Sequence, residues 1–366
     1  MTRTRAPPPG VTQTSPLAST APDEIGVANA NAGTPAASAL STPRGMSTAA
    51  RLQCMPALNP IDEQRHVPDD SMLWNESYYM DWFSEDQALG GYVRIGFYPS
   101  MDRVWYWACL VGPDRSLITV IEHDVPMPRD AASLGVRHSG IWADHTIEVP
   151  GEHMSINLES FGLRLDSPSD VYHDPRGEQI PFGFELDFFT DQDAYMWPPV
   201  TPRYEIPCRV HGRVLVGAET IEFDGWGQRD HSWGATRDWW TNTWCWSAGR
   251  LDDGTRFHAT GGFFPDDDYG IAYELEPGGS FREFDQVAIT TELGDEGLPT
   301  IGRQVFGDLD LSFEPLAFSP VLLVHPDGRE SRFPRALARV TAADGRTGTG
   351  WIEWNQPPPP SNASDS

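Results

Sequence analysis

The chain of 366 residues is poor in cysteine and basic residues and has no long apolar run. No segment approaches the 18 or more apolar residues of a membrane helix, and no apolar stretch follows Arg3 and Arg5 as in a signal peptide. The four cysteines include no CxxC pair, which excludes a disulfide-rich scaffold: Cys54, Cys109, Cys208 and Cys245. We therefore expect a cytoplasmic protein, neither secreted nor inserted into a membrane, whose cysteines are small core residues.

Basic residues are half as frequent as acidic ones, 26 against 53, and the formal net charge is −27. A polyanionic partner would be repelled over most of the surface. This composition argues against nucleic acid and anionic membranes as partners and leaves the oligomeric state open.

Common cofactor and nucleophile motifs are also missing. No HExxH or CxxC spacing offers a metal site, so we expect no metal. No GxGxxG, GxxxxGK[ST] or GxSxG motif supports a dinucleotide, a nucleotide or a serine nucleophile, so we expect no cofactor. What remains is acid–base chemistry or simple binding.

Composition divides the chain into tails and a folded region. Residues 1–58 and 356–366 are dominated by small residues and proline, which cannot bury enough apolar surface to order themselves. Between them, the proline-rich stretch Pro198-Pro-Val-Thr-Pro202 suggests a boundary. We expect two successive β domains, 59–200 and 201–355, the second carrying the motif described below.

The apolar pattern of the folded region has mostly period two, and helix is nearly absent, which predicts an all-β fold of antiparallel barrels or sandwiches. Glycine-containing turns such as Asp252-Asp-Gly254, Pro326-Asp-Gly328 and Ala343-Asp-Gly345 support hairpins. The predicted strands are 91–98, 103–111, 117–123, 153–161, 182–189, 204–216, 219–223, 243–251, 257–264, 270–275, 286–292, 304–311, 332–341 and 348–354.

One segment, 224–246, combines six tryptophans with several charged residues and contains Gly227-Gln-Arg-Asp-His-Ser-Trp-Gly234. It is too polar for a core strand and too aromatic for an ordinary loop, as expected for a pocket with one polar end. In an extended segment Asp230 and His231 point to opposite sides. Burial among indoles would raise the pKa of Asp230 and make it a general acid, whereas His231 could act as acid or base near neutral pH.

Alternative readings accompany each candidate residue. Arg229, Asp230 and Arg237 could form a buried ion-paired clasp, with His231 bonded to a backbone carbonyl. Glu76 and Tyr78 could serve the pocket, or the segment from Asn75 to Tyr79 could contribute turn and core residues.

Two further polar residues lie in apolar strands. Arg94 requires a carboxylate partner such as Glu76 or Asp230. His258 could join the cavity or be a hydrogen-bonded core histidine.

The motif Arg-Asp-His-Ser-Trp-Gly, preceded by Gly-Trp-Gly and followed by Arg-Asp-Trp-Trp, resembles the signature of the carotenoid 1,2-hydratase (hydroxyneurosporene synthase) and AttH-like superfamily. Weaker likeness at Asn75-Glu-Ser-Tyr-Tyr79, Gly90-Gly-Tyr-Val-Arg-Ile-Gly96 and Tyr204-Glu-Ile-Pro-Cys-Arg-Val-His-Gly212 extends it over residues 70–355 and is similar to an uncharacterised bacterial branch. The resemblance implies two lipocalin-like barrels and a hydratase, dehydratase or cyclase without redox cofactor.

We therefore expect a cofactor-independent lyase or isomerase, a hydratase or cyclase acting on an apolar unsaturated terpenoid, steroid or polyketide-like molecule. Asp230 and His231 are the expected catalytic residues. The alternatives are a non-catalytic carrier of apolar molecules and a partner-binding module. The expected substrate-binding residues are Glu76, Tyr78, Arg94, Trp105, Trp233, Arg237, Trp239, Trp240, Trp244, Trp246 and His258.

Overall fold

The computed structural model describes residues 58–234, 237–263, 268–294 and 296–357, and in these ranges the fold is all-β, as predicted. The only helices of the described residues are three short 3-10 turns: η1 (Pro60–Glu63), η2 (Pro99–Met101) and η3 (Pro168–Tyr172). Within these ranges no helix is long and apolar enough to span a membrane. The predicted tails lie outside the described residues except at their inner ends.

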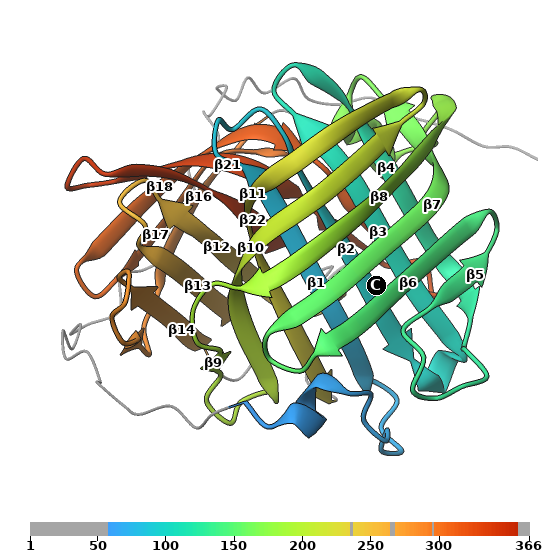
Figure 1. Ribbon diagram of the computed structural model, residues 1–366, viewed down its shortest axis with the longest axis horizontal. Coiled ribbons are helices and arrows are strands. Elements are labelled where there is room, and N and C mark those ends of the chain that lie inside the picture. Colours follow the sequence, from blue (N-terminus) through green and yellow to red (C-terminus); the bar gives the residue numbers. More distant parts are fainter. Residues whose placement is uncertain (1–57, 235–236, 264–267, 295, 358–366) are drawn as a thin grey trace, which may run out of the picture. The chain divides into compact units, whose positions relative to one another are not determined.

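The first sheet is antiparallel, and its ladder returns on itself (Figure 1). Its hydrogen-bonded order is β4-β3-β2-β1-β11-β10-β8-β7-β6-β5; β9 pairs with β10, and β4 also pairs with β7. The strands are β1 (Asn75–Ser84), β2 (Gly90–Tyr98), β3 (Arg103–Gly112), β4 (Arg115–Pro126), β5 (Val136–His138), β6 (Ile141–Val149), β7 (His153–Leu165), β8 (Glu178–Thr190), β9 (Tyr195–Met196), β10 (Arg203–Val216) and β11 (Glu219–Gly234).

The second sheet is also antiparallel, in the order β15-β14-β13-β12-β22-β21-β18-β17-β16, and β19 and β20 form a separate hairpin. Its strands are β12 (Thr243–Leu251), β13 (Arg256–Phe263), β14 (Asp268–Leu275), β15 (Arg282–Phe284), β16 (Ala288–Leu293), β17 (Pro299–Phe306), β18 (Leu309–Phe318), β21 (Arg335–Ala342) and β22 (Thr347–Asn355). The hairpin comprises β19 (Val321–Val324) and β20 (Glu330–Phe333).

The chain passes from one sheet to the other between β11 and β12. Strands β10 and β11, which we expected in the second domain, pair with β8 and β1 in the first sheet. The Arg-Asp-His motif therefore lies on a strand of the first sheet. The proline-rich stretch at 198–202, where we expected the boundary, lies between β9 and β10, which pair with each other in the first sheet.

Strand β1 was missing from the predicted strands because buried polar residues, Asn75, Glu76, Ser77 and Asp81, interrupt its apolar residues. Nine of its ten residues and all of β2 are buried, so both faces of these strands are covered. The predicted strand 304–311 is also wrong: β17 ends at Phe306, and Gly307, with φ +52°, turns the chain into β18. Gly254, Gly328 and Gly345 have positive φ, as their predicted turns require.

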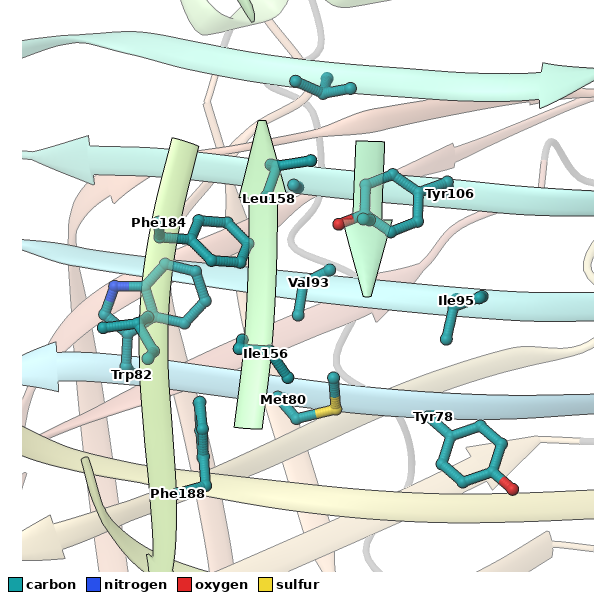
Figure 2. Packing of buried hydrophobic residues seen from close by; sticks show 14 of the residues in the cluster. Tyr78, Met80, Trp82, Val93, Ile95, Tyr106, Ile156, Leu158, Phe184 and Phe188 are labelled. Atoms are coloured by element: carbon teal, nitrogen blue, oxygen red, sulfur yellow. The ribbon is translucent and has the colours of Figure 1, made fainter. Parts of the chain in front are cut away.

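Two apolar clusters explain this double burial. The first sheet closes into a barrel through the pairing of β4 with β7. On one face of β1, the side chains of Tyr78, Met80 and Trp82 point into this first barrel, where they meet side chains of β7 and β8 (Figure 2). The alternating Tyr79 and Phe83 pack in a different cluster that contains residues of the second sheet, such as Trp246 and Trp351. Strand β1 therefore separates two interiors.

Candidate active site

A cavity of about 270 Å³ is lined by residues of both sheets. Of the residues predicted to form the site, Arg94, Asp230, Arg237, Trp239, Trp244 and Trp246 line it. The prediction missed Ser77, Tyr79, Trp197, Val200, Thr201, Arg203, Asn242, Thr260, Tyr269, Phe333, Arg335 and Glu353. Aromatic rings and charged groups thus share one small space, the combination expected of a specific small-molecule site.

A row of side chains crosses five strands of the first sheet, and its three middle members, Arg94, Tyr79 and Asp230, line the cavity. Register pairs Trp107 of β3 with Arg94 of β2, Arg94 with Tyr79 of β1, Tyr79 with Asp230 of β11, and Asp230 with Glu205 of β10. Directly opposed residues share a face of a sheet. The row therefore carries an unbroken sequence of aromatic and charged groups along the cavity side.

Asp230 and Glu205 share one counter-ion, Arg203. Its Nη2 donates to Asp230 Oδ2 at 2.7 Å, and its Nε donates to Glu205 Oε1 at 2.7 Å. Only Asp230 of the two acids lines the cavity. Although burial opposes the charge, both acids raise the pKa of Arg203, so the guanidinium stays charged.

The surroundings push the two acids in opposite directions. Burial raises the pKa of Asp230 to about 8 and Glu205 and Glu353 add to this, while Arg203 and Arg237 oppose it. Burial also opposes ionisation of Glu205, but Arg203, His258 and Gln228 outweigh it and hold its pKa below the usual value. The arrangement therefore favours a protonated Asp230 beside an ionised Glu205, a division of roles typical of acid–base sites.

Glu205 is also contacted by Gln228 of β11 and by two residues of the second sheet. Gln228 Nε2 donates to it at 2.9 Å and the indole N–H of Trp246 at 3.2 Å. His258 Nε2 lies 3.6 Å from Glu205 and its Nδ1 lies 2.9 Å from the carbonyl of Ser247, and burial lowers the pKa of His258 to about 4. His258 therefore lies behind Glu205, held by Ser247, and does not line the cavity.

Arg94 has no carboxylate partner, contrary to the expectation from its apolar strand. No carboxylate of the described residues lies within 4 Å of its guanidinium. Its Nη2 donates to the hydroxyl of Tyr98 at 3.1 Å, and the guanidinium contacts the rings of Trp107 and Trp239. Glu76 and Asp230, the partners we expected, are bound by other groups.

His231 and Arg229 lie on the opposite face of β11 from Asp230, inside the first barrel. His231 Nδ1 is 2.8 Å from the carbonyl of Asp62, and Nε2 is 3.0 Å from Glu76 Oε1. Arg229 pairs with the buried Glu63 at 2.5 Å. These contacts fasten the segment 59–66, which we call the clasp segment, to the barrel.

Three of the predicted substrate-binding residues, Glu76, Tyr78 and Trp233, also help to hold the clasp segment against the barrel. Glu76 accepts from Arg65 and from the amide of His66, and burial, which raises its pKa, is outweighed by His231 and His66, so that its pKa falls to about 2. The Tyr78 ring stacks on His231 at 3.8 Å, and Trp233 stacks on His66 at 3.8 Å. None of Glu76, Tyr78 and Trp233 lines the cavity.

The clasp segment brings together the one metal-like cluster of the described residues. Potential ligand atoms of His66, Glu76 and His231 all lie within 4.8 Å of one another. Both Glu76 oxygens already accept hydrogen bonds, one of them from the cation of Arg65. The cluster is therefore saturated by protein donors and resembles an ion-pair network more than an open metal site.

Trp105 and Trp240 support the cavity without lining it. Both belong to the buried aromatic cluster that includes Trp107 and Trp239, and the Trp240 indole donates to the carbonyl of Leu323 at 3.1 Å. Arg203 and Glu205, which sequence reasoning missed, alternate around Tyr204 at the start of a predicted strand. Two charges on one face of an apolar strand are the signal that would have found them.

Comparison with known proteins places the chain in a family without an assigned role. It belongs to the family described as a domain of unknown function (DUF7064), whose model matches residues 59–358. The sequence matches none of the curated proteins with which it was compared.

Solved structures share the fold at low sequence identity. One is a protein called AttH (NE1406) from Nitrosomonas europaea, 16% identical with TM-score 0.59, covering 84% of this chain and 99% of that one. Kievitone hydratase from Nectria haematococca is 12% identical with TM-score 0.53, covering 83% and 94%. CghA, solved with Sch210972, is 10% identical with TM-score 0.53, covering 80% and 94%.

Proposed function

Starting from this membership of a family of unknown function, we propose that the chain is a cofactor-independent lyase or isomerase of the hydratase or cyclase type. Its cavity takes a compact, apolar, unsaturated molecule of terpenoid or polyketide-like character. The observation that carries the proposal is Asp230, a buried carboxyl on the cavity wall whose pKa is raised to about 8 next to an ionised acid. A carboxyl that keeps its proton at neutral pH is suited to general acid catalysis.

The proposed step is proton transfer from Asp230 to one carbon of a double bond. The electron pair of that bond forms the new C–H bond, and the adjacent carbon becomes cationic. The faces of Trp239, Trp244 and Trp246 stabilise this cation. Arg203, already hydrogen-bonded to Asp230, stabilises the carboxylate that remains.

The cation then ends in one of two ways. Water adds to it and releases a proton back to Asp230, which is hydration, or an internal double bond attacks it and the cation formed by ring closure loses a proton to Asp230, which is cyclisation. In each case Asp230 regains its proton and is ready for the next cycle. His231, which we expected to assist, faces the clasp segment across the strand, and we assign it a positioning role.

The likeness in fold to kievitone hydratase and to CghA, which was solved with a small molecule, supports the proposal. At identities of 12% and 10% this likeness concerns the fold and does not extend to catalytic residues. The support for a catalytic role therefore comes from the residues of this chain.

The second candidate function is a non-catalytic carrier. The ion pair between Asp230 and Arg203 at 2.7 Å favours it, because an ionised, paired aspartate has no proton to donate. The aromatic lining alone would still bind apolar molecules.

A turnover assay separates the two functions. Unsaturated terpenoids and polyketide-like compounds are incubated with the wild-type chain, with Asp230→Asn and with Asp174→Asn, an exposed control. Products are detected by a mass increase of one water or by a new isomer of unchanged mass. We expect Asp230→Asn to lose about 10²- to 10⁴-fold in rate while still binding ligand by tryptophan quenching.

The pH dependence of turnover tests the role of Asp230 in a second way. Because Asp230 must be protonated to act, wild-type turnover should fall as the pH rises through about 8. Binding by both variants without turnover by the wild type would show a carrier, and equal turnover by wild type and Asp230→Asn would remove Asp230 from the mechanism.

A further inference from the structure

The charges on the cavity wall do not balance. Four arginines line it, Arg94, Arg203, Arg237 and Arg335, in a chain whose net charge is −27. With Asp230 protonated, Arg203 is balanced by the ionised Glu205 behind the wall, and Arg335 is paired with Glu353. Two positive charges remain. The excess therefore belongs to Arg94 and Arg237.

Arg94 is the more deeply buried of the two, with 3% of its surface exposed. Its Nη1 is buried and has no hydrogen-bond partner in the part of the chain that the structure describes, although its Nη2 donates to Tyr98. Its guanidinium lies 4.7 Å from the ring of Trp107 and 5.1 Å from that of Trp239. Aromatic faces attract a cation but do not accept its N–H groups as a carboxylate does.

Among the described residues, Arg237 is bound by neutral oxygens only. Its Nη1 donates to Ser77 at 3.2 Å and to Asn75 at 3.4 Å, and its Nη2 donates to Ser232 at 2.9 Å. Its guanidinium contacts the same Trp239 ring as Arg94, at 5.5 Å. No carboxylate of the described chain lies within 4 Å of it.

The buried cation of Arg94 and the partly buried cation of Arg237, both near the Trp239 ring, destabilise one another. Burial together with the charges of Arg94 and Arg203 lowers the pKa of Arg237 to about 10. A buried charge without a counter-ion is costly, and a folded protein keeps one where a ligand supplies the partner.

We propose that Arg94 and Arg237 form an anion subsite, and that the molecule bound in the cavity carries a carboxylate on its apolar, unsaturated body. This inference deepens the proposed function and rests on the cavity being its substrate site. A carboxylate is planar and has two oxygens, one for the free N–H of Arg94 and one for Arg237.

The subsite fixes the orientation of the substrate relative to the acid. Arg94 and Asp230 lie in one cross-strand row with Tyr79 between them, so their backbones are roughly 10 Å apart. A carboxylate held at Arg94 directs the rest of the molecule along the aromatic wall toward Asp230. The double bond that receives the proton then lies several bonds from the carboxylate.

The test uses two probes of equal shape, 2-naphthoate and 2-naphthamide, which differ in charge. Their dissociation constants are measured by quenching of tryptophan fluorescence with the full chain and with Arg94→Met, Arg237→Met and Arg103→Gln. The last is a control that removes an exposed arginine of β3. We expect the wild type and the control to bind the naphthoate about 10- to 100-fold more tightly than the amide.

In Arg94→Met and Arg237→Met this preference should largely disappear, while the affinity for the amide stays within about threefold. The melting temperature of Arg94→Met should equal or exceed that of the wild type, because a methionine of similar length removes an uncompensated buried charge. A merely structural Arg94 would lower the melting temperature and weaken both probes equally. That result, or equal affinity of the wild type for the two probes, would overturn the inference.

The two proposals fail separately. A wild-type protein that selects the naphthoate but converts no substrate keeps the anion subsite and loses the acid mechanism. A protein that converts neutral substrates in an Asp230-dependent way and shows no preference for the naphthoate keeps the mechanism and loses the subsite.

Discussion

Replacing Asp230 by asparagine should make the protein more stable at neutral pH, and the gain should depend on pH. The pKa of Asp230 is raised from 3.8 to about 8, mainly by burial, so the folded chain binds this proton more tightly than the unfolded chain does. Its favourable contribution is complete below pH 3.8 and is lost as the pH rises toward 8. Asparagine, which has no proton to lose, is free of this dependence.

The size of the effect follows from the shift. One proton bound differently by the two states changes the free energy of unfolding by about 1.4 kcal/mol for each pH unit. Between pH 5 and pH 7 the advantage of Asp230→Asn should therefore grow by up to about 3 kcal/mol, and it should level off above pH 8. Pairing with Arg203 opposes the shift and makes this an upper value.

The assay is urea unfolding followed by tryptophan fluorescence at pH 5, 6, 7, 8 and 9. It compares the wild type with Asp230→Asn and with Asp174→Asn, whose side chain is 82% exposed and whose difference from wild type should be flat. A constant difference for Asp230→Asn, or a wild type that is more stable at every pH, would refute the reasoning. Asp230 would then be ionised in the folded chain and held by Arg203 as a structural pair.

The clasp segment yields three more predictions. Arg229→Met leaves Glu63 buried without its cation and should lower the free energy of unfolding by about 3–5 kcal/mol, measured with urea. The double variant Glu63→Leu, Arg229→Met should recover most of this loss. An equal loss in the single and the double variant would contradict a charge effect. The pKa of Glu76 is lowered from 4.5 to about 2, which should contribute roughly 3 kcal/mol to the free energy of unfolding above pH 4.5, lost as the pH falls toward 2. The difference in stability between the wild type and Glu76→Gln should therefore shrink on acidification. A difference that does not change with pH would contradict this prediction. Treatment with EDTA should leave the melting temperature unchanged, and a rise with added zinc that His66→Ala abolishes would show that the cluster of His66, Glu76 and His231 binds metal after all.

The sequence was informative where apolar residues dominate a strand, whether or not one face meets water. The alternating strand at 153–161 was predicted within a few residues of β7, and the fully buried β2 was predicted at 91–98. Strand β1 was missed because four of its buried residues, Asn75, Glu76, Ser77 and Asp81, are polar and interrupt its apolar pattern. For the same reason Ser77 and Tyr79 of β1 were not predicted to line the cavity.

Only some of the predicted site residues lie on the cavity. The cluster of tryptophans and charges at 224–246 pointed to the cavity, and Asp230, Arg237 and three tryptophans do line it. The partners of Asp230 were not predictable, because Arg203 lies 27 residues earlier and meets it only through the register of β10 against β11. The face taken by His231 depends equally on pairing, which composition does not reveal.

The alternation along β11 has a practical consequence for redesign. Even-numbered positions 228, 230 and 232 face the second sheet, and odd-numbered positions 229, 231 and 233 face the barrel and the clasp segment. An engineer who wishes to reshape the cavity can vary the even positions, together with Ser77 and Tyr79 on the neighbouring strand, without touching the contacts that hold the clasp segment. A library that randomises the whole Arg-Asp-His triplet would instead mix altered specificity with loss of folding, and its inactive members would tell nothing about the chemistry.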